Sequence, residues 1–367
     1  MKIAIWATAI KNRHTGGRVF PWLLAYAFAY NNFDVDIFTN TMPLFAKNFN
    51  DYPSGERVKI HVNKLFLFFP FKKYDLLVIG PHLASRKSFI YDRFFFYPMA
   101  KLFKRISGCE MWYIDHESPN WINEVLPGVR PYSKYKYSNK IIPKTDAILS
   151  ATKTGADYAA RYYTDFNPGI KFIQVYHPIN SIVADKIKIF NKEDKIIYFG
   201  RFSEKHKNPE IIVNIIKSLP KGYKLLIIGS KEQISQDLYE KMFFESKKNE
   251  IIIEFKQGIT DLEKYEELAS SKLLLYTSTF EGYGLPPIEA QYVGTPVICS
   301  DLPVLREVNK NAIFVDFENQ SALKVVIEKA LHTNYTLEQL KSSVEPFAKF
   351  ENFASNLGNA AKAYFKS

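Results

Sequence analysis

The chain has 367 residues, of which 47% are hydrophobic, and its formal net charge is +11. This length predicts two domains with proper cores, and no low-complexity tract indicates disorder. The only two cysteines, Cys109 and Cys299, lack metal-site spacing, which argues against a disulfide scaffold or a structural zinc site and favours a reducing compartment. The positive charge fits a nucleic acid, an anionic membrane or a phosphorylated substrate, without choosing among them.

The first half of the chain alternates short apolar runs with helix-like segments. A helix is predicted over 18–31, and strands are predicted over 2–10, 34–39, 58–67, 74–80, 111–115, 146–151 and 171–177. This alternation indicates a parallel α/β sheet. Gly16 and Gly17 lie at the first passage from strand to helix, where such a sheet places its ligand crevice. The apolar start lacks a signal-peptide cleavage site, and no apolar run is long enough to span a membrane.

Basic and aromatic residues interleave over residues 64–105. The basic ones include Lys72, Lys73, Arg86, Lys87, Arg93, Lys101, Lys104 and Arg105. One interpretation is a buried helix with a solvated basic face. The other is an interfacial surface that contacts an anionic membrane. Nucleic-acid binding by this stretch has no recognisable module behind it.

A second series of strands and helices follows a charged stretch with few strong signals. Strands are predicted over 195–200, 223–229, 251–255, 273–276, 296–300 and 312–316, and helices over 211–219 and 351–367. The pattern predicts an N-terminal domain over 1–178, a linker over 179–194 and a C-terminal domain over 195–349, with 350–367 as a final helix.

The stretch 276–289, YTSTFEGYGLPPIE, carries the strongest functional signal. Gly282 and Gly284 allow a sharp turn close to a ligand, and the two prolines that follow suit the first turn of a helix. The free amides at such a helix start, those of Gly284 and Leu285, attract anions. Glu281 and Glu289 bracket the loop, and carboxylates hydrogen-bond well to sugar hydroxyls. We therefore expect a ligand with both phosphate and sugar groups.

The string FEGYGLPPIEA (280–290), followed by GTPVICSDLPVLREV (294–308), resembles the signature of glycosyltransferase family 4. The resemblance implies the GT-B fold, two Rossmann-like domains facing across a cleft, with the C-terminal helix crossing back to the first domain. It implies retaining transfer of a hexose-type sugar from a UDP- or GDP-sugar to a hydroxyl of a glycan or lipid-linked saccharide, in surface polysaccharide or glycoconjugate synthesis. No cofactor is expected. Asp34-Val35-Asp36 alternates with apolar residues as a strand does, so we read it as a strand and predict no catalytic metal.

The same resemblance assigns roles to individual residues. GRFSEKHKN (200–208) is similar to a family motif that binds the diphosphate, which points to Arg201 and to Lys207, with Lys205 as a competitor. Glu289 would bind ribose and Glu281 the transferred sugar. The remaining donor-binding residues would be Gly16, Gly17, Ile259, Gly282, Tyr283, Gly284 and Leu285. His116 resembles the family's active-site histidine, and Glu117 beside it is a candidate contact of the acceptor.

Three alternatives stay open. They are a different enzyme on the same fold, such as an epimerase or phosphorylase, a nucleotide-sugar-binding protein without catalysis, and a basic nucleic-acid-binding protein. The expected location is the cytoplasm, at the inner face of the cell membrane if the stretch 64–105 contacts lipid. The sequence leaves the sugar, the nucleotide and the acceptor open.

Overall fold

The computed structural model describes residues 1–9, 16–64, 68, 70, 72–80, 92–130, 132–188 and 191–366. The chain divides into unit 1, Met1–His177 with Phe350–Ser367, and unit 2, Pro178–Lys349. The stretch 179–194, predicted as a linker, belongs to unit 2 and contains helix α7 (Ser181–Ala184). Most of the loop between the first strand and the first helix lies outside the described residues, as do Arg86 and Lys87.

Unit 1 contains one parallel sheet of seven strands in the order β3-β2-β1-β4-β5-β6-β7. The strands are β1 (Lys2–Trp6), β2 (Asp34–Thr39), β3 (Val58–Val62), β4 (Leu76–Ile79), β5 (Glu110–Asp115), β6 (Ala147–Ser150) and β7 (Lys171–Gln174). Every predicted strand of the first half of the chain is present, with ends that differ by a few residues. Asp36 lies within β2, as the alternating pattern predicts.

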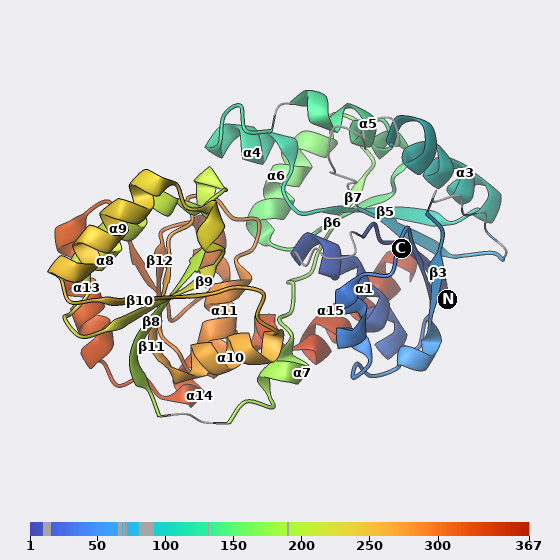
Figure 1. The fold of residues 1–367 in the computed structure, drawn as a ribbon. Helices are drawn as coiled ribbons and strands as arrows, with labels where there is room; N and C mark the ends of the chain where they lie inside the picture. Colours follow the sequence, from blue (N-terminus) through green and yellow to red (C-terminus); the bar gives the residue numbers. More distant parts are fainter. Residues whose placement is uncertain are drawn as a thin grey trace. The chain divides into compact units, whose positions relative to one another are not determined.

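Helices cover both faces of this sheet (Figure 1). One face carries α1 (Gly16–Tyr30) and α15 (Phe350–Lys366), and the other carries α3 (Tyr97–Ser107), α4 (Pro119–Val125), α5 (Lys136–Asn139) and α6 (Lys153–Tyr163). Side chains alternate across β5: Trp112 packs against Phe28 of α1 and Tyr364 of α15. Tyr113 points the other way, into the core shared with α3 and α6.

Unit 2 contains a parallel sheet of six strands in the order β10-β9-β8-β11-β12-β13. The strands are β8 (Glu193–Gly200), β9 (Lys224–Gly229), β10 (Ile252–Lys256), β11 (Ser271–Tyr276), β12 (Val297–Ser300) and β13 (Ile313–Val315). The apolar runs of β8, β9 and β11 are buried because helices lie on both faces of a parallel sheet.

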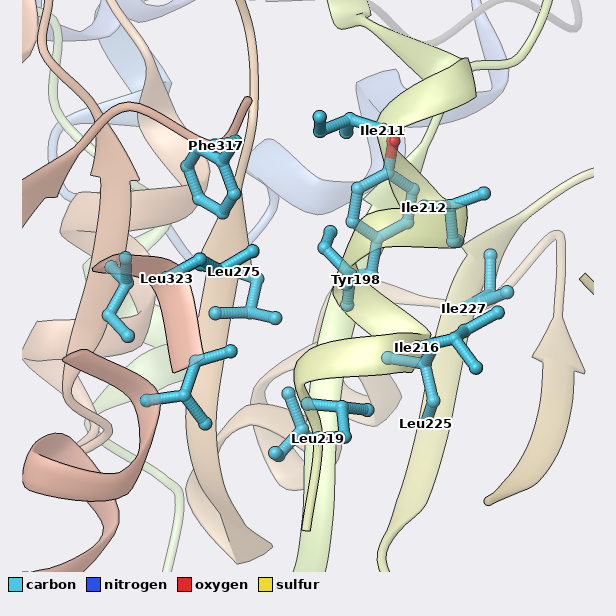
Figure 2. Close-up of a cluster of buried hydrophobic side chains, with 14 of the residues drawn as sticks. Tyr198, Ile211, Ile212, Ile216, Leu219, Leu225, Ile227, Leu275, Phe317 and Leu323 are labelled. Carbon is cyan, nitrogen blue, oxygen red and sulfur yellow. The ribbon is translucent and has the colours of Figure 1, made fainter. Parts of the chain in front are cut away.

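The helices of unit 2 also form two layers (Figure 1). One layer contains α8 (Ile212–Ser218), α9 (Gln236–Lys248) and α13 (Gln320–His332), and the other contains α7, α10 (Asp261–Ser270), α11 (Leu285–Tyr292) and α14 (Leu337–Ala348), while α12 (Pro303–Val308) follows β12. Figure 2 shows the core of the first layer, where Ile212 and Ile216 of α8 lie over Tyr198, Leu225 and Ile227 of the sheet. This core supports the strand ends from which the candidate site projects.

Candidate active site

The candidate site of unit 2 is built on the loop that joins β11 to α11. Gly284 caps this helix with a φ of +89°, a backbone conformation that strains other residues. A Cβ at this position would also lie 2.4 Å from Leu305 Cδ2. Because Pro286 and Pro287 carry no N–H, the amides of Gly284 and Leu285 are the main free donors at this helix start. The amides of Gly284 and Leu285 thus lie at the carboxyl edge of the sheet, where they can donate hydrogen bonds to a ligand.

Glu281 lies in this loop in a buried cluster with Lys207 and Tyr276. Lys207 Nζ and the Tyr276 hydroxyl both donate to Glu281 Oε1. Only 11% of the Glu281 side chain is exposed, and burial by itself would raise the pKa of its carboxyl. The charge and hydrogen bond of Lys207, with hydrogen bonds from Ser278 and Tyr276, outweigh burial and lower that pKa. Glu281 is therefore an ionised, oriented acceptor.

Hydrogen bonds connect the loop that carries this cluster to the segment that follows β8. The Thr279 amide donates to the His206 carbonyl at 2.8 Å, and Thr277 Oγ1 donates to the Lys207 carbonyl at 3.1 Å. Of the two lysines that the sequence left in competition, the structure brings Lys207 to Glu281 and leaves Lys205 exposed. Arg201 is largely exposed at the end of β8, and its charge acts on the Tyr276 hydroxyl. Arg201 and Lys207 thus lie around the same loop.

Glu289, on α11, belongs to a second buried pair. Lys264 of α10 donates to Glu289 Oε1 at 2.7 Å and to Asp261 Oδ1 at 3.0 Å, and the Tyr265 hydroxyl lies 3.4 Å from Glu289 Oε1. Burial alone would lower the pKa of the Lys264 ammonium, but the two carboxylates raise it. Lys264 therefore stays charged and neutralises Glu289.

Sequence reasoning missed Lys264 and Asp261. They lie in the charged run DLEKYEE, which has the composition of a solvated helix face. Only the packing of α10 on α11 shows that Lys264 points inward. Ile259, one of the predicted donor-binding residues, is half-buried in the turn before α10, whose first turn holds Asp261. Lys264 thus connects this turn to Glu289, because it contacts both Asp261 and Glu289.

The candidate residues of unit 1 lie at the end of β5. His116 packs edge-on against Phe20 at 5.5 Å, and a Cβ at Gly17 would lie 3.3 Å from His116 Nε2. Burial and the nearby His177 lower the pKa of His116 to about 4, although a backbone hydrogen bond with Gly17 opposes them. At neutral pH the imidazole is therefore uncharged, and any side chain at position 17 would crowd it. Gly16 is the first residue of α1.

Asp115 and Glu117, on either side of His116, have different surroundings. Burial raises the pKa of Asp115 to about 7, although the Tyr163 hydroxyl donates to its Oδ1 at 2.9 Å. Its Oδ2 has no hydrogen-bond partner among the residues that the structure describes. Glu117 accepts a hydrogen bond from Arg130 Nη1 at 2.7 Å. Asp115 and Arg130 therefore join the candidate residues of unit 1, although no local sequence pattern marks them.

Within the described ranges, no group of three or more His, Cys, Asp or Glu side chains is placed to hold a metal ion. Cys109 and Cys299 are both buried free thiols. None of the helices in the described part of the chain is long and apolar enough to cross a membrane.

Part of unit 2 matches a known protein family. Residues 181–345 match the family model described as "Glycosyl transferases group 1". This range includes Arg201, Lys207, Glu281 and Glu289, so the match covers the residues that build the site. It supports a glycosyltransferase.

Two curated relatives are mannosyltransferases. The chain is 28% identical over 225 residues to "O-antigen chain mannosyltransferase RfbU" of Salmonella typhimurium, a match that covers 58% of each protein. It is 33% identical over 112 residues to "Serotype-specific mannosyltransferase WbdA" of Escherichia coli, which covers 30% of this chain and 14% of that protein. The chain thus spans less than two thirds of the length of these relatives.

Solved structures show the fold. Sucrose-phosphate synthase from Thermosynechococcus elongatus superposes with a TM-score of 0.69 at 17% identity, over 100% of this chain and 99% of that chain. Anabaena HepE in complex with UDP and glucose superposes with a TM-score of 0.65 at 13% identity, over 100% and 99% of the two chains. Together with the two parallel sheets, these likenesses confirm the predicted α/β fold of the GT-B type.

Proposed function

We propose that this protein is a retaining glycosyltransferase that moves a hexose-type sugar from a nucleoside-diphosphate sugar to a hydroxyl of a glycan or lipid-linked saccharide. The observation that carries the proposal is the loop 277–284 with the helix α11 that follows it. Glu281 of the loop and Glu289 of the helix each form a buried pair with a lysine, and the free amides of the helix start lie between them in sequence. Cations and free amides suit a diphosphate, and ionised carboxylates suit sugar hydroxyls. The family match of unit 2 supports the same activity.

Each part of the donor has a candidate partner in unit 2. Arg201 and Lys207 would bind the diphosphate and stabilise the charge that develops on the leaving group. Glu281 would accept hydrogen bonds from the transferred sugar. Glu289, held by Lys264, would accept those of the ribose hydroxyls. Lys207 neutralises Glu281, so a diphosphate bound here would share this lysine with the carboxylate.

Mannose is the sugar that we propose first. Two relatives carry the name mannosyltransferase, and one of them acts on an O-antigen chain. A surface polysaccharide or its lipid-linked precursor is therefore the acceptor that we propose. GDP-mannose is the first donor to test, with UDP-glucose and UDP-galactose as comparisons, because HepE was solved with UDP and glucose.

For unit 1 we propose that His116 and Glu117 contact hydroxyl-bearing substrate. A neutral imidazole can donate or accept a hydrogen bond without bringing a charge into a buried site. Arg130 keeps Glu117 in one orientation through the 2.7 Å ion pair. The carboxylate of Glu117 can then accept a hydrogen bond from the acceptor.

We further propose that transfer needs no metal ion. The two cations Arg201 and Lys207 supply positive charge where a metal would otherwise neutralise the diphosphate. Activity should then persist in EDTA and should not rise when Mg²⁺ or Mn²⁺ is added back. A loss of activity in EDTA that Mg²⁺ restores would contradict this part of the proposal. Proton NMR of the product tests retention through the configuration of its anomeric carbon.

The outer face of α3 suits contact with an anionic membrane. Leu102 and Ile106 are 37% and 54% exposed on this helix, and Phe94, just before it, is 56% exposed. Lys101, on the same helix, feels the like charges of Lys140 and Lys144, which shows that cations gather there. Exposed apolar side chains next to lysines are typical of interfacial helices. We propose that this face holds the enzyme at the inner face of the cell membrane, near a lipid-linked acceptor.

The test of the transferase activity is release of nucleoside diphosphate from a labelled donor, with and without a pool of lipid-linked saccharides. Glu281→Ala should lower turnover more than donor affinity, whereas Glu289→Ala should weaken the nucleotide itself. Glu266→Ala provides the matched control, since this glutamate of α10 is exposed. Donor binding without any release by the wild type would favour the non-catalytic binding protein. Binding of oligonucleotides with a steep salt dependence, and of no donor, would favour the nucleic-acid-binding protein.

A further inference from the structure

A cavity of about 240 Å³ lies in unit 2, away from the loop 277–284. We call it the basal pocket, and its polar lining consists of Asp185, Lys188, Lys192, Tyr292, Tyr335 and Lys341. Lys192 directly precedes β8, whose other end is Gly200. The pocket is therefore at the amino edge of the sheet, roughly 25 Å along β8 from the carboxyl edge. It is separate from the donor site proposed above.

The basal pocket has more positive charge than its own carboxylate can neutralise. Asp185 is its one lining acid, and Asp185 Oδ1 already accepts hydrogen bonds from Lys341 Nζ at 2.8 Å and from the Tyr292 hydroxyl at 2.9 Å. Lys192 Nζ donates to the neutral hydroxyl of Thr295 at 2.7 Å. Within the described ranges, no carboxylate forms an ion pair with Lys188 or Lys192. Two cations of the pocket thus lack a counter-charge.

The pKa of Lys192 reflects the excess of positive charge around it. Burial, and then the like charge of Lys195, lower the pKa of the Lys192 ammonium to about 8. Lys195 itself is neutralised by Glu267 at 2.7 Å. At neutral pH Lys192 still carries its proton for most of the time. The residue as a whole is exposed, so an anion can reach its ammonium group beside Thr295.

The volume of the basal pocket and the helix ends that line it indicate which kind of anion it can hold. The start of α14 and the end of α11 both line the pocket, so the opposite charges of the two helix ends largely cancel and the lysines dominate. Tyr292, Tyr335 and Leu337 supply hydroxyl groups and apolar surface. A volume near 240 Å³ holds about eight water molecules, which is room for a phosphate group with a small substituent.

We propose that the basal pocket is a binding site for a phosphate-bearing anion, held by Lys188 and Lys192 and packed against Tyr335. The site is independent of the proposed transferase activity. It lies where α11 ends, the helix that starts at the donor loop and carries Glu289. The phosphate can belong to a soluble monoester or to a lipid headgroup, because both present the same chemistry to two lysines.

The experiment is a titration of the full chain with inorganic phosphate in a phosphate-free buffer, with KCl added to hold the ionic strength constant. Saturable binding in a calorimeter is expected for the wild type. Lys188→Met and Lys192→Met should each weaken phosphate by about threefold to fivefold, the usual effect of one partly exposed ion pair. Since Lys188 is exposed, its replacement leaves the fold intact even if the Lys192 variant is destabilised.

Two matched variants separate this site from other cations. Lys324→Met removes an exposed lysine of α13, and Lys248→Met removes an exposed lysine of α9. Both should bind phosphate as the wild type does. Equal affinity in the wild type and in both pocket variants would overturn the proposal, and so would binding without saturation. Loss of phosphate binding in either control variant, with no loss in the two pocket variants, would place the anion elsewhere on the surface and also overturn it.

A second arm identifies the source of the phosphate. Vesicles of phosphatidylcholine with phosphatidic acid are sedimented with the wild type and with Lys188→Met/Lys192→Met. Vesicle binding that falls in the double variant supports the pocket with a lipid headgroup as its ligand. Saturable binding of free phosphate, with equal vesicle binding by both proteins, supports the pocket with a soluble ester as its ligand. No dependence on Lys188 and Lys192 in either arm would exclude the site.

Discussion

Replacing Lys207 by Met tests whether the donor loop holds an ionised, buried carboxylate. The substitution keeps the length of the side chain but leaves Glu281 without its cation, and 89% of the Glu281 side chain is shielded from water. Removing one partner of a buried pair costs about 3 kcal/mol or more. We therefore expect Lys207→Met to destabilise unit 2 by about 3 kcal/mol at pH 7.

The cost should depend on pH in a direction that the structure fixes. In the wild type the pKa of Glu281 is lowered, so its contribution is present above the unfolded pKa and is lost as the pH falls through the folded pKa. Without Lys207, burial becomes the main influence and the folded pKa of Glu281 rises. The variant then folds best when Glu281 is protonated. Its deficit relative to the wild type should therefore shrink from pH 7 to pH 4.

The double variant Lys207→Met/Glu281→Gln removes both charges together. It should be more stable than Lys207→Met, with a coupling of about 2 kcal/mol in the double-mutant cycle. All four tryptophans of the chain lie in unit 1, so tryptophan fluorescence follows unit 1 while far-ultraviolet circular dichroism follows both units. The shift should appear in the dichroism transition, with the exposed Lys324→Met as control. A coupling below about 0.5 kcal/mol, within the usual error of additivity, would refute the reasoning.

Three further predictions concern separate parts of the chain. Burial raises the pKa of Asp115 to about 7 in the folded state, so its full contribution to stability is present below the unfolded pKa, near 4, and is lost progressively as the pH rises to 7. Asp115→Asn should therefore match the wild type at pH 3 and exceed its stability by up to about 4 kcal/mol at pH 8, as measured by tryptophan fluorescence. Equal stability at pH 8 would contradict this. Gly284→Ala forces a Cβ against Leu305 at positive φ and should lower the free energy of unfolding of unit 2, followed by circular dichroism, by about 2 kcal/mol or more. An unchanged free energy of unfolding would speak against the strained turn. Anionic vesicles should retain the wild type more than neutral ones, and Leu102→Ser/Ile106→Ser should lose most of this binding while Val325→Ser on α13 should not; retention by the double variant would exclude the α3 face.

The sheets could be predicted because their strands are apolar runs with clear turn residues at both ends. Strand ends were less certain, since they depend on the partner strand. Residues 171–177 look extended throughout, but β7 ends at Gln174, which pairs with Ser150, the last residue of β6. The helix α3 was one of two interpretations of an aromatic, basic stretch. Its Ala100 and Phe103 are buried while Lys101 and Ile106 are exposed, a division that composition alone does not give.

The candidate site was predictable where it is local and unpredictable where it depends on packing. Glu281 and Glu289 lie in one contiguous strand–loop–helix segment, so their spacing already placed them together. Spacing did not separate Lys205 from Lys207, because only the contact with the loop distinguishes them. Lys264 has the local signature of a surface lysine, and its inward position follows from the packing of α10 on α11. The role of Lys264 therefore could not be predicted from the sequence.

The most direct test of the central claim is calorimetric titration of GDP-mannose, UDP-glucose, GDP and UDP into the wild type and Glu289→Ala in the presence of EDTA. The wild type should bind one nucleotide class saturably. The variant should lose about 2 kcal/mol of binding free energy, as expected when a charged hydrogen-bond acceptor is removed. Glu266→Ala should bind as the wild type does. Binding of none of the four ligands, or equal affinity in Glu289→Ala, would contradict the claim that the loop 277–284 and α11 form a nucleotide-sugar site.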